Sequence, residues 1–523
     1  MSRETAHALR AVRAIRRARG EGSSRGDVVY AVYAGVMVAA IVGVPIVRAV
    51  VLYLAEPAAF AVLVDVGPTV SGTVFALACA AFVALGGVRG QALLSPFLVF
   101  AVAGGGHPRR RTLLQPVVRS VLLLAVAAAA IALLPALVVA GVGDATVGGA
   151  IAFAGAGALV GVVCGGCWLL GQRVTAAVRA WIFVGVLATW AVWVVVPGSA
   201  GVLPWGWFAS LFPSGGPGAD LADAADAALG WAALGGLGVL AAAALAVVPM
   251  LLDGLRGPEL LSQAQRWQTA GTLAFTGDLA MAMGEFRAVP RRGRRLAAIG
   301  GGGLALMFAR RDLVGSLRTP ARFALACAGC VGFGLLITVA VGASGPGVWI
   351  AACAAAIVGF LALGVWSDGF RHVAEVASAP PLYGVSTLRL LGLHAALPVV
   401  GGVVFSGVGV GVGGAVLGGG GVGPSWSALV AAVLCVLLLV LVRMYDSAKG
   451  PLPLTLMAPV PTPAGDASAL VVAAWQADAV ILSGVVVAVT VVSVAGGIVG
   501  GVLAAVGLGV VVGWMARARV LAG

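Results

Sequence analysis

The chain has 523 residues, of which 61% are hydrophobic and only 10% are charged. This composition excludes an ordinary soluble globular protein and is typical of an integral membrane protein. The net charge of +13 could indicate nucleic-acid binding, but the basic residues are spread over many segments without an interleaved aromatic groove. Attraction to anionic lipid headgroups is the simpler interpretation, so we expect membrane lipids as partners and no nucleic acid.

Apolar segments recur along the whole chain. Each is near the length of about 20 residues that is needed to cross a bilayer. The twelve segments are residues 28–50, 69–88, 120–141, 146–170, 180–196, 230–252, 321–342, 348–366, 393–413, 427–442, 479–495 and 497–515. Together they predict an all-α polytopic membrane protein with about twelve transmembrane helices.

The basic residues predict how these spans are oriented. Of the 32 lysines and arginines, 31 fall in alternating connections that would share one side of the membrane, and only Arg48 falls in the others. The positive-inside rule assigns the basic side to the cytoplasm. We therefore expect a multi-pass protein of the cell membrane with both termini in the cytoplasm.

The N-terminal arm, residues 1–27, is arginine-rich and leads into a full-length span, so no cleavable signal is predicted. Within the arm, residues 3–19 place apolar side chains on one helical face, and residues 304–318 repeat this arrangement before the seventh span. Both segments are expected to be helices that lie in the plane of the membrane interface. The alternative is that they are only basic flanks of the neighbouring spans.

The predicted domains are two six-span halves at 28–252 and 321–515, a cytoplasmic linker at 253–320 and a short cytoplasmic tail at 516–523. The two halves are similar in pattern. Shifting Gly87–Leu114 by 277 positions places it on Gly364–Leu391 without a gap, and both segments lead from a second span through an intracellular connector into a third. Repeats of this kind are common among transporters.

The first half has the only long outer connection, residues 197–229, between its fifth and sixth spans. Trp205, Trp207 and Phe208 form an aromatic cluster there, which is suited to the headgroup level of the membrane. The second half has only a glycine pair, 496–497, at the corresponding position. The outer ends of the two halves are therefore expected to differ.

The seven cysteines all lie inside spans, which excludes a secreted disulfide framework. Two CxxC pairs are present, Cys164 with Cys167 and Cys327 with Cys330. Four thiolates could hold a zinc ion if the pairs met as a tetrahedron. We favour the interpretation that these cysteines are small packing residues, because a GxxxG stripe runs through the helix of the first pair. No metal is therefore predicted.

The residues that a membrane enzyme needs are missing from the sequence. The four histidines are scattered, no HExxH occurs, and no span carries paired carboxylates. A formal GxGxxG at 409–414 has no strand before it, so it is not expected to bind a dinucleotide. Without a P-loop, the chain is not predicted to be an enzyme, to bind a cofactor or to hydrolyse ATP itself. The near absence of ionisable side chains within the spans also counts against an ion-coupled carrier.

In this layout the chain resembles the membrane subunit of an ABC-2-type exporter, and in particular large actinobacterial permease families in which two six-span halves are fused. The shared features are a basic interfacial helix before each half, a basic connector between the second and third spans, and an outer insertion between the fifth and sixth. The segments Gly450–Pro463 and Ala474–Asp478 fit the same layout. The glycine pair at 496–497 departs from it, because the second half lacks the insertion.

The resemblance implies that the connectors between second and third spans dock on ATP-binding subunits. These connectors are residues 89–112, with Arg109, Arg110 and Arg111, and residues 367–390, with Arg371 and Arg389.

We therefore hypothesise that the chain is the permease of an ATP-driven exporter that moves a lipophilic or amphipathic substrate between its halves. A pair of separate ABC ATP-binding subunits would hydrolyse the ATP. Two alternatives stay open: an ATP-independent carrier or flippase, and a membrane scaffold subunit that transports nothing itself.

Overall fold

The computed structural model describes residues 11, 14–15, 25–104, 108–142, 145–196, 198–213, 224–275, 279–286, 293, 295–377, 384–417, 426–450, 452–462, 465–466 and 468–522. The chain folds into two compact units, Met1–Thr272 and Leu273–Gly523, whose boundary lies inside the predicted linker 253–320. The predicted interfacial segment 3–19 falls almost entirely outside the described residues.

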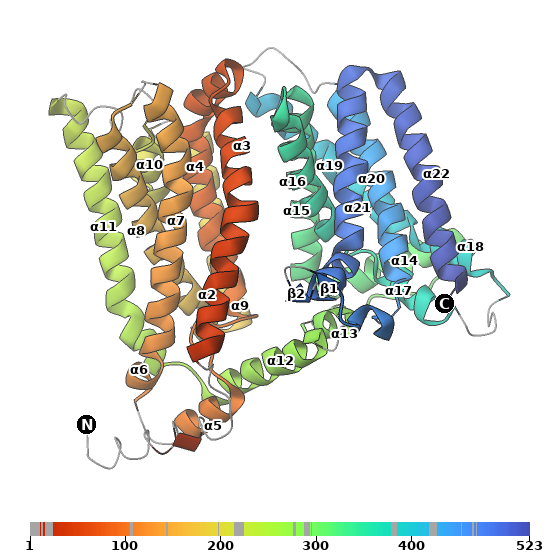
Figure 1. The fold of residues 1–523 in the computed structure, drawn as a ribbon, viewed down its shortest axis with the longest axis horizontal. Helices are drawn as coiled ribbons and strands as arrows, with labels where there is room; N and C mark the ends of the chain where they lie inside the picture. The colour runs from red at the N-terminus through yellow and green to blue at the C-terminus, as the bar shows by residue number, and fades with distance from the viewer. Residues whose placement is uncertain are drawn as a thin grey trace. The chain divides into compact units, whose positions relative to one another are not determined.

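The first unit is a bundle of long helices, drawn from red to green in Figure 1. In chain order its elements are α2 (Arg25–Val38), the π-helix η1 (Ala39–Gly43), α3 (Val44–Leu54), α4 (Pro57–Gly86), α5 (Pro96–Gly104), α6 (Arg109–Thr112), α7 (Leu114–Val142), α8 (Val147–Arg173), α9 (Ala176–Val195), the 3-10 turn η2 (Ser199–Gly201), α10 (Pro204–Ser210), α11 (Ala224–Asp253) and α12 (Gly257–Phe275). Helices α4, α7 and α11 all pack against α8, which is the central helix of this unit.

The second unit is also helical. Its elements are α13 (Leu279–Gly284), α14 (Leu304–Leu317), α15 (Pro320–Gly342), α16 (Pro346–Leu363), α17 (Asp368–Glu375), α18 (Thr387–His394), α19 (Ala396–Leu417), α20 (Trp426–Ser447), the 3-10 turn η3 (Leu454–Met457), the strands β1 (Pro461–Thr462) and β2 (Gly465–Asp466), α21 (Ser468–Gly496) and α22 (Ile498–Ala522). The two-residue strands pair antiparallel, with Pro461 opposite Asp466. The segment 304–318, predicted to be a helix, forms α14.

The described helices fit the predicted membrane spans. Eleven of them are long and apolar enough to cross a membrane, and α16 with α17 adds a twelfth if this pair, bent by 66°, is one span. Every predicted span overlaps one of these helices. A helix satisfies its own backbone hydrogen bonds, which lipid cannot do for it. The prediction of an all-α polytopic membrane protein is confirmed, whereas the pseudo-repeat and the side on which the termini lie stay predictions.

The second span begins earlier than predicted. The sequence places it at 69–88, whereas α4 begins at Pro57 and runs through Asp65 and Pro68. Pro57 is tolerated because it occupies the first helical turn, where the backbone N–H has no partner anyway. A helix of 30 residues is about 45 Å long, which exceeds the hydrocarbon thickness of about 30 Å. The first turns of α4, with the exposed Asp65, can therefore extend beyond the hydrocarbon.

Glycines bring helix backbones into direct contact in both units. A Cβ at Gly161 of α8 would lie 2.5 Å from the carbonyl oxygen of Leu124 on α7, as the GxxxG stripe predicts. In the second unit, a Cβ at Gly409 of α19 would lie 2.0 Å from the carbonyl oxygen of Val331 on α15. Gly409, which belongs to the formal GxGxxG, therefore has a packing role.

The connection between the last two candidate membrane spans of each unit differs, as the sequence predicts. In the first unit, η2 and α10 stand between α9 and α11. In the second, α21 and α22 are joined through Gly497, whose φ of +147° is a conformation that side-chain-bearing residues rarely adopt.

Candidate functional site

The first connector, which we define as residues 87–113, runs from the end of α4 to the start of α7 and contains α5 and α6. The family resemblance implies that an ATPase docks on residues 89–112 of this segment. A hydrogen-bonded side chain from α8 and another from α12 hold its first part in place.

Two buried glutamines form the centre of this attachment. On α8, Gln172 accepts a hydrogen bond from the backbone N–H of Ala92 at 3.1 Å. Its Nε2 donates to Oε1 of Gln263 on α12 at 3.2 Å, and Nε2 of Gln263 in turn donates to the carbonyl oxygen of Gly86 at 3.3 Å. Because both glutamines are buried, breaking one of these bonds would leave an amide unsatisfied.

Two tryptophans extend the attachment. The indole N–H of Trp168 donates to the carbonyl oxygen of Arg89 at 2.6 Å, and that of Trp267 donates to the carbonyl oxygen of Val88 at 3.1 Å. The guanidinium of Arg89 lies 5.0 Å from the centre of the Trp267 ring. A Cβ at Gly90 would collide with the side chain of Gln172, so the connector needs glycine to approach α8 this closely.

The three consecutive arginines of α6 have different surroundings. Arg110 pairs with Asp253 at the end of α11: its backbone N–H donates to Oδ1 at 3.0 Å and its Nε lies 3.6 Å from Oδ2. Arg109 is half-buried and Arg111 is exposed, and neither has an ionic partner in the part of the chain that the structure describes. The connector itself lacks acidic residues, as the sequence indicates, but Asp253 partly balances its charge.

The first part of the second connector, helix α17, packs into its own unit. Helix α17 turns inward after α16 and buries Phe370 and Val373, together with the preceding Trp366. Arg371 on α17 is half-buried, whereas Arg389 on α18 is exposed. Residues 378–383, which belong to the predicted connector 367–390, lie outside the described residues.

A histidine and an aspartate attach the second connector to α14. Nδ1 of His394, at the end of α18, lies 2.6 Å from Oδ2 of Asp312 on α14. The ring of His394 is buried and meets the ring of Phe308 edge to face, with 4.9 Å between the ring centres. The helix predicted to lie at the membrane interface is therefore bound to the connector that follows the second half's second span.

The structure corrects the interpretation of the outer aromatic cluster. Trp205 and Phe208 on α10 are only 7% and 6% exposed, so protein covers them and they do not face lipid headgroups. Both rings pack against Phe75 of α4, at 4.9 Å and 6.0 Å between ring centres, and Phe208 also stacks on Phe153 of α8. Trp207 is half-buried and donates its indole N–H to the carbonyl oxygen of Gly201. Helix α10 is thus part of the core of the first unit.

The two CxxC pairs belong to different units. Sγ of Cys164 lies 3.9 Å from Sγ of Cys79 on α4, and Cys330 is buried in the apolar core of the second unit. No group of three or more His, Cys, Asp or Glu side chains among the described residues could hold a metal ion. The burial of Cys164 and Cys330 agrees with a role in helix packing.

Sequence reasoning did not find an ionic network at one end of the second unit. Oδ1 of Asp478 on α21 lies 2.6 Å from Nζ of Lys449, and Oδ2 lies 3.0 Å from Nη2 of Arg519 on α22. The hydroxyl of Tyr445 on α20 also donates to Oδ2 at 3.1 Å. One carboxylate therefore connects three helices. An aspartate beside the predicted span 479–495 and the only lysine of the chain were the available signals.

Comparisons with protein-family models, with curated proteins and with solved structures find no match for this chain. The fold alone therefore defines its class, an integral all-α membrane protein with many spans. Each unit has its own candidate site, the described part of its connector, which polar contacts attach to that unit.

Proposed function

We propose that this chain is the membrane subunit of an ATP-driven exporter of the ABC-2 type, whose ATP-binding subunits dock on the two connectors. The first part of the first connector, residues 88–92, supports this proposal most strongly, because hydrogen bonds fix it to α8 and α12. An ATPase that pushes on a membrane protein needs a rigid segment to pass the displacement on to the spans. The glutamine and tryptophan contacts would provide that rigidity.

The arginines of α6 suit a docking surface. Arg109 and Arg111 have no ionic partner within the described residues, whereas Arg110 already pairs with Asp253. An acidic surface on the partner would complement the first two, and such complementarity determines register and association rate more than affinity. In the second connector, the exposed Arg389 would contribute more to docking than the half-buried Arg371.

The buried polar residues favour a lipophilic or amphipathic cargo. Among the buried polar side chains of the described residues, the glutamines, serines and threonine do not ionise and His394 does. The carboxylate of Asp478 in α21 is already paired with Lys449 and Arg519. His394 lies at the end of its span and is paired with Asp312. A carrier coupled to protons or metal ions usually keeps ionisable groups deep in the membrane. Energy from a partner ATPase therefore fits these helices better.

The variant Arg109→Gln/Arg111→Gln tests this proposal. When the chain is purified from its native membrane, we expect an ABC ATPase to copurify with the wild type and to be depleted at least fivefold with the variant. The loss should grow with added salt, because exposed charges are screened. The matched control is Arg295→Gln/Arg517→Gln, which removes two exposed arginines from the second unit and should retain the partner.

Absence of an ATPase from the wild-type preparation would contradict an ATP-driven exporter and favour a carrier or a scaffold. Equal recovery of the ATPase with the wild type and with the α6 variant would show that α6 is not the docking element.

A further inference from the structure

Three of the seven cysteines of the chain meet where α4 packs against α8. Sγ of Cys79 on α4 lies 3.9 Å from Sγ of Cys164 on α8, and the thiol of Cys167, three residues further along α8, interacts with the same Cys79 thiol. Residues three apart are neighbours on a helix, so both partners of Cys79 come from one face of α8. Helix packing needs only small side chains, for which alanine or serine would serve, whereas thiols in contact can also react with one another.

The backbones of α4 and α8 approach each other closely beside these thiols. A Cβ at Gly171 of α8 would lie 2.1 Å from the carbonyl oxygen of Val83 on α4. Val83 follows Cys79 by four residues and Gly171 follows Cys167 by four, so the same rows of the two helices carry both contacts. A disulfide needs Cα atoms about 4.4–6.8 Å apart, which helices in such close contact can provide.

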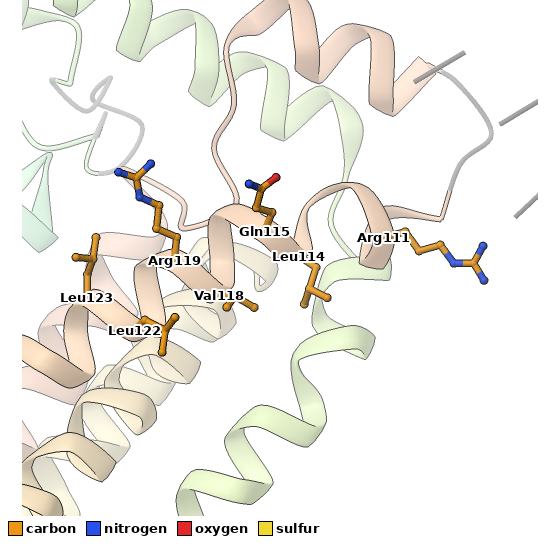
Figure 2. Close-up of a pocket in the computed structure, with 7 residues that line it drawn as sticks. All are labelled: Arg111, Leu114, Gln115, Val118, Arg119, Leu122 and Leu123. Carbon is orange, nitrogen blue, oxygen red and sulfur yellow. The ribbon is translucent and has the colours of Figure 1, made fainter. Parts of the chain in front are cut away.

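The three thiols differ in exposure. Cys79 and Cys164 are 2% and 3% exposed, whereas Cys167 is only partly buried. The shallow hollow at the start of α7, shown with its lining residues in Figure 2, is lined by no cysteine and gives a large oxidant no route to them. A small neutral peroxide is the oxidant that suits this burial. It would meet Cys167 first, because oxidation of a thiol follows its exposure.

We propose that hydrogen peroxide joins α4 to α8 through a disulfide between Cys79 and Cys167. The peroxide first oxidises Cys167 to a sulfenic acid: the O–O bond breaks, one oxygen stays on sulfur and the other leaves as water. The thiol of Cys79 then attacks that sulfur, and the S–O bond breaks as the hydroxyl leaves with the thiol proton as a second water. The two sulfurs are oxidised and the two peroxide oxygens are reduced. Cys164 keeps its thiol.

The disulfide would fix the end of α4 beside the start of the first connector. Helix α4 ends at Gly86, and the first connector follows it directly. Trp168, next to Cys167 in the chain, donates its indole N–H to the carbonyl oxygen of Arg89 in that connector. A covalent bond between α4 and α8 would therefore prevent the two helices from sliding past each other where the connector begins. This modification site does not depend on the proposed export function.

Tryptic peptide mapping of the detergent-purified full chain, before and after treatment with hydrogen peroxide, tests the site. Trypsin leaves Cys79 in the peptide 49–89 and leaves both Cys164 and Cys167 in the peptide 120–173. The proposed disulfide links these two peptides, whereas a bond within the CxxC pair leaves them separate. We expect the linked peptides in the oxidised wild type and their release by a thiol reductant. A maleimide should modify two fewer of the seven cysteines in the oxidised, denatured chain.

Four variants identify the sulfurs that take part. Cys79→Ser and Cys167→Ala should each abolish the linked peptides, whereas Cys164→Ala should retain them. The matched control is Cys353→Ala, which removes an exposed thiol of the second unit and should behave like the wild type. The wild-type map decides the question even if a variant does not fold. Separate peptides in the oxidised wild type, a bond confined to the CxxC pair, or linked peptides in Cys167→Ala would each overturn the proposed disulfide.

Discussion

Gly409→Ala is expected to destabilise the second unit by about 3 kcal/mol, the upper end of the usual cost of overpacking. The added Cβ would lie 2.0 Å from the carbonyl oxygen of Val331. Ordinary contact is near 3.5 Å, so α15 and α19 would have to separate by roughly 1.5 Å. A backbone carbonyl cannot turn away as a flexible side chain does. The separation would therefore loosen the packing of Phe333 and Ile337, which are fully buried beside this crossing.

Thermal unfolding of the purified protein in detergent measures this effect, and Gly411→Ala is the matched control. Gly411 lies two residues further along α19, and a Cβ there would meet nothing within 4 Å. Alanine is a better helix former than glycine by about 1 kcal/mol, so the control should be neutral or slightly stabilising. Equal melting temperatures for the two variants would show that the helices do not cross at Gly409.

Asp478→Asn is expected to destabilise the same unit by about 3 kcal/mol, because it would leave two cations without their counter-charge. The side chains of Lys449 and Arg519 are only 10% and 25% exposed, so water would compensate them poorly. The hydrogen bond from Tyr445 would also lose its charged acceptor. The ends of α20, α21 and α22 should separate first.

Asp253→Asn is the control for this prediction. Its pair with Arg110 joins side chains that are 42% and 56% exposed, and exposed pairs contribute less than about 1 kcal/mol. Adding Lys449→Met to Asp478→Asn should restore part of the stability, because removing both charges costs less than stranding one. Thermal unfolding in detergent measures both variants. A decrease in melting temperature that is no larger for Asp478→Asn than for Asp253→Asn would contradict the network.

Hydropathy predicted the presence of every span but not all of the helix ends. The eleventh span was predicted at 479–495, whereas α21 begins at Ser468 and includes Asp478. A charged residue lowers local hydropathy, so the sequence alone suggests that the span stops beside it. In the structure Lys449 and Arg519 neutralise Asp478, and the helix continues through it. Asp65 lowers the local hydropathy of the first turns of α4 in the same way, so the sequence alone predicts a later start for this span.

Contacts between distant segments were beyond what the sequence pattern could indicate. Arg110 and Asp253 are 143 residues apart, and nothing near either residue predicts their pairing. The sequence predicts Trp205 and Phe208 at the headgroup level because they belong to an aromatic cluster in the only long outer connection. Their burial depends on Phe75 and Phe153, which come from two other helices.

The ATPase-docking proposal requires that both connectors face the cytoplasm, and cysteine labelling of intact cells tests this most directly. In a variant without native cysteines, single cysteines would replace Val202, Arg266 and Arg389. Val202 is 76% exposed beside α10, and the two arginines are exposed on α12 and α18. An impermeant maleimide should modify position 202 in intact cells, but positions 266 and 389 only after permeabilisation. Labelling of 389, or of 266 on the helix α12 that is hydrogen-bonded to the first connector, in intact cells would place a connector on the side that lacks ATP and would contradict the proposed docking.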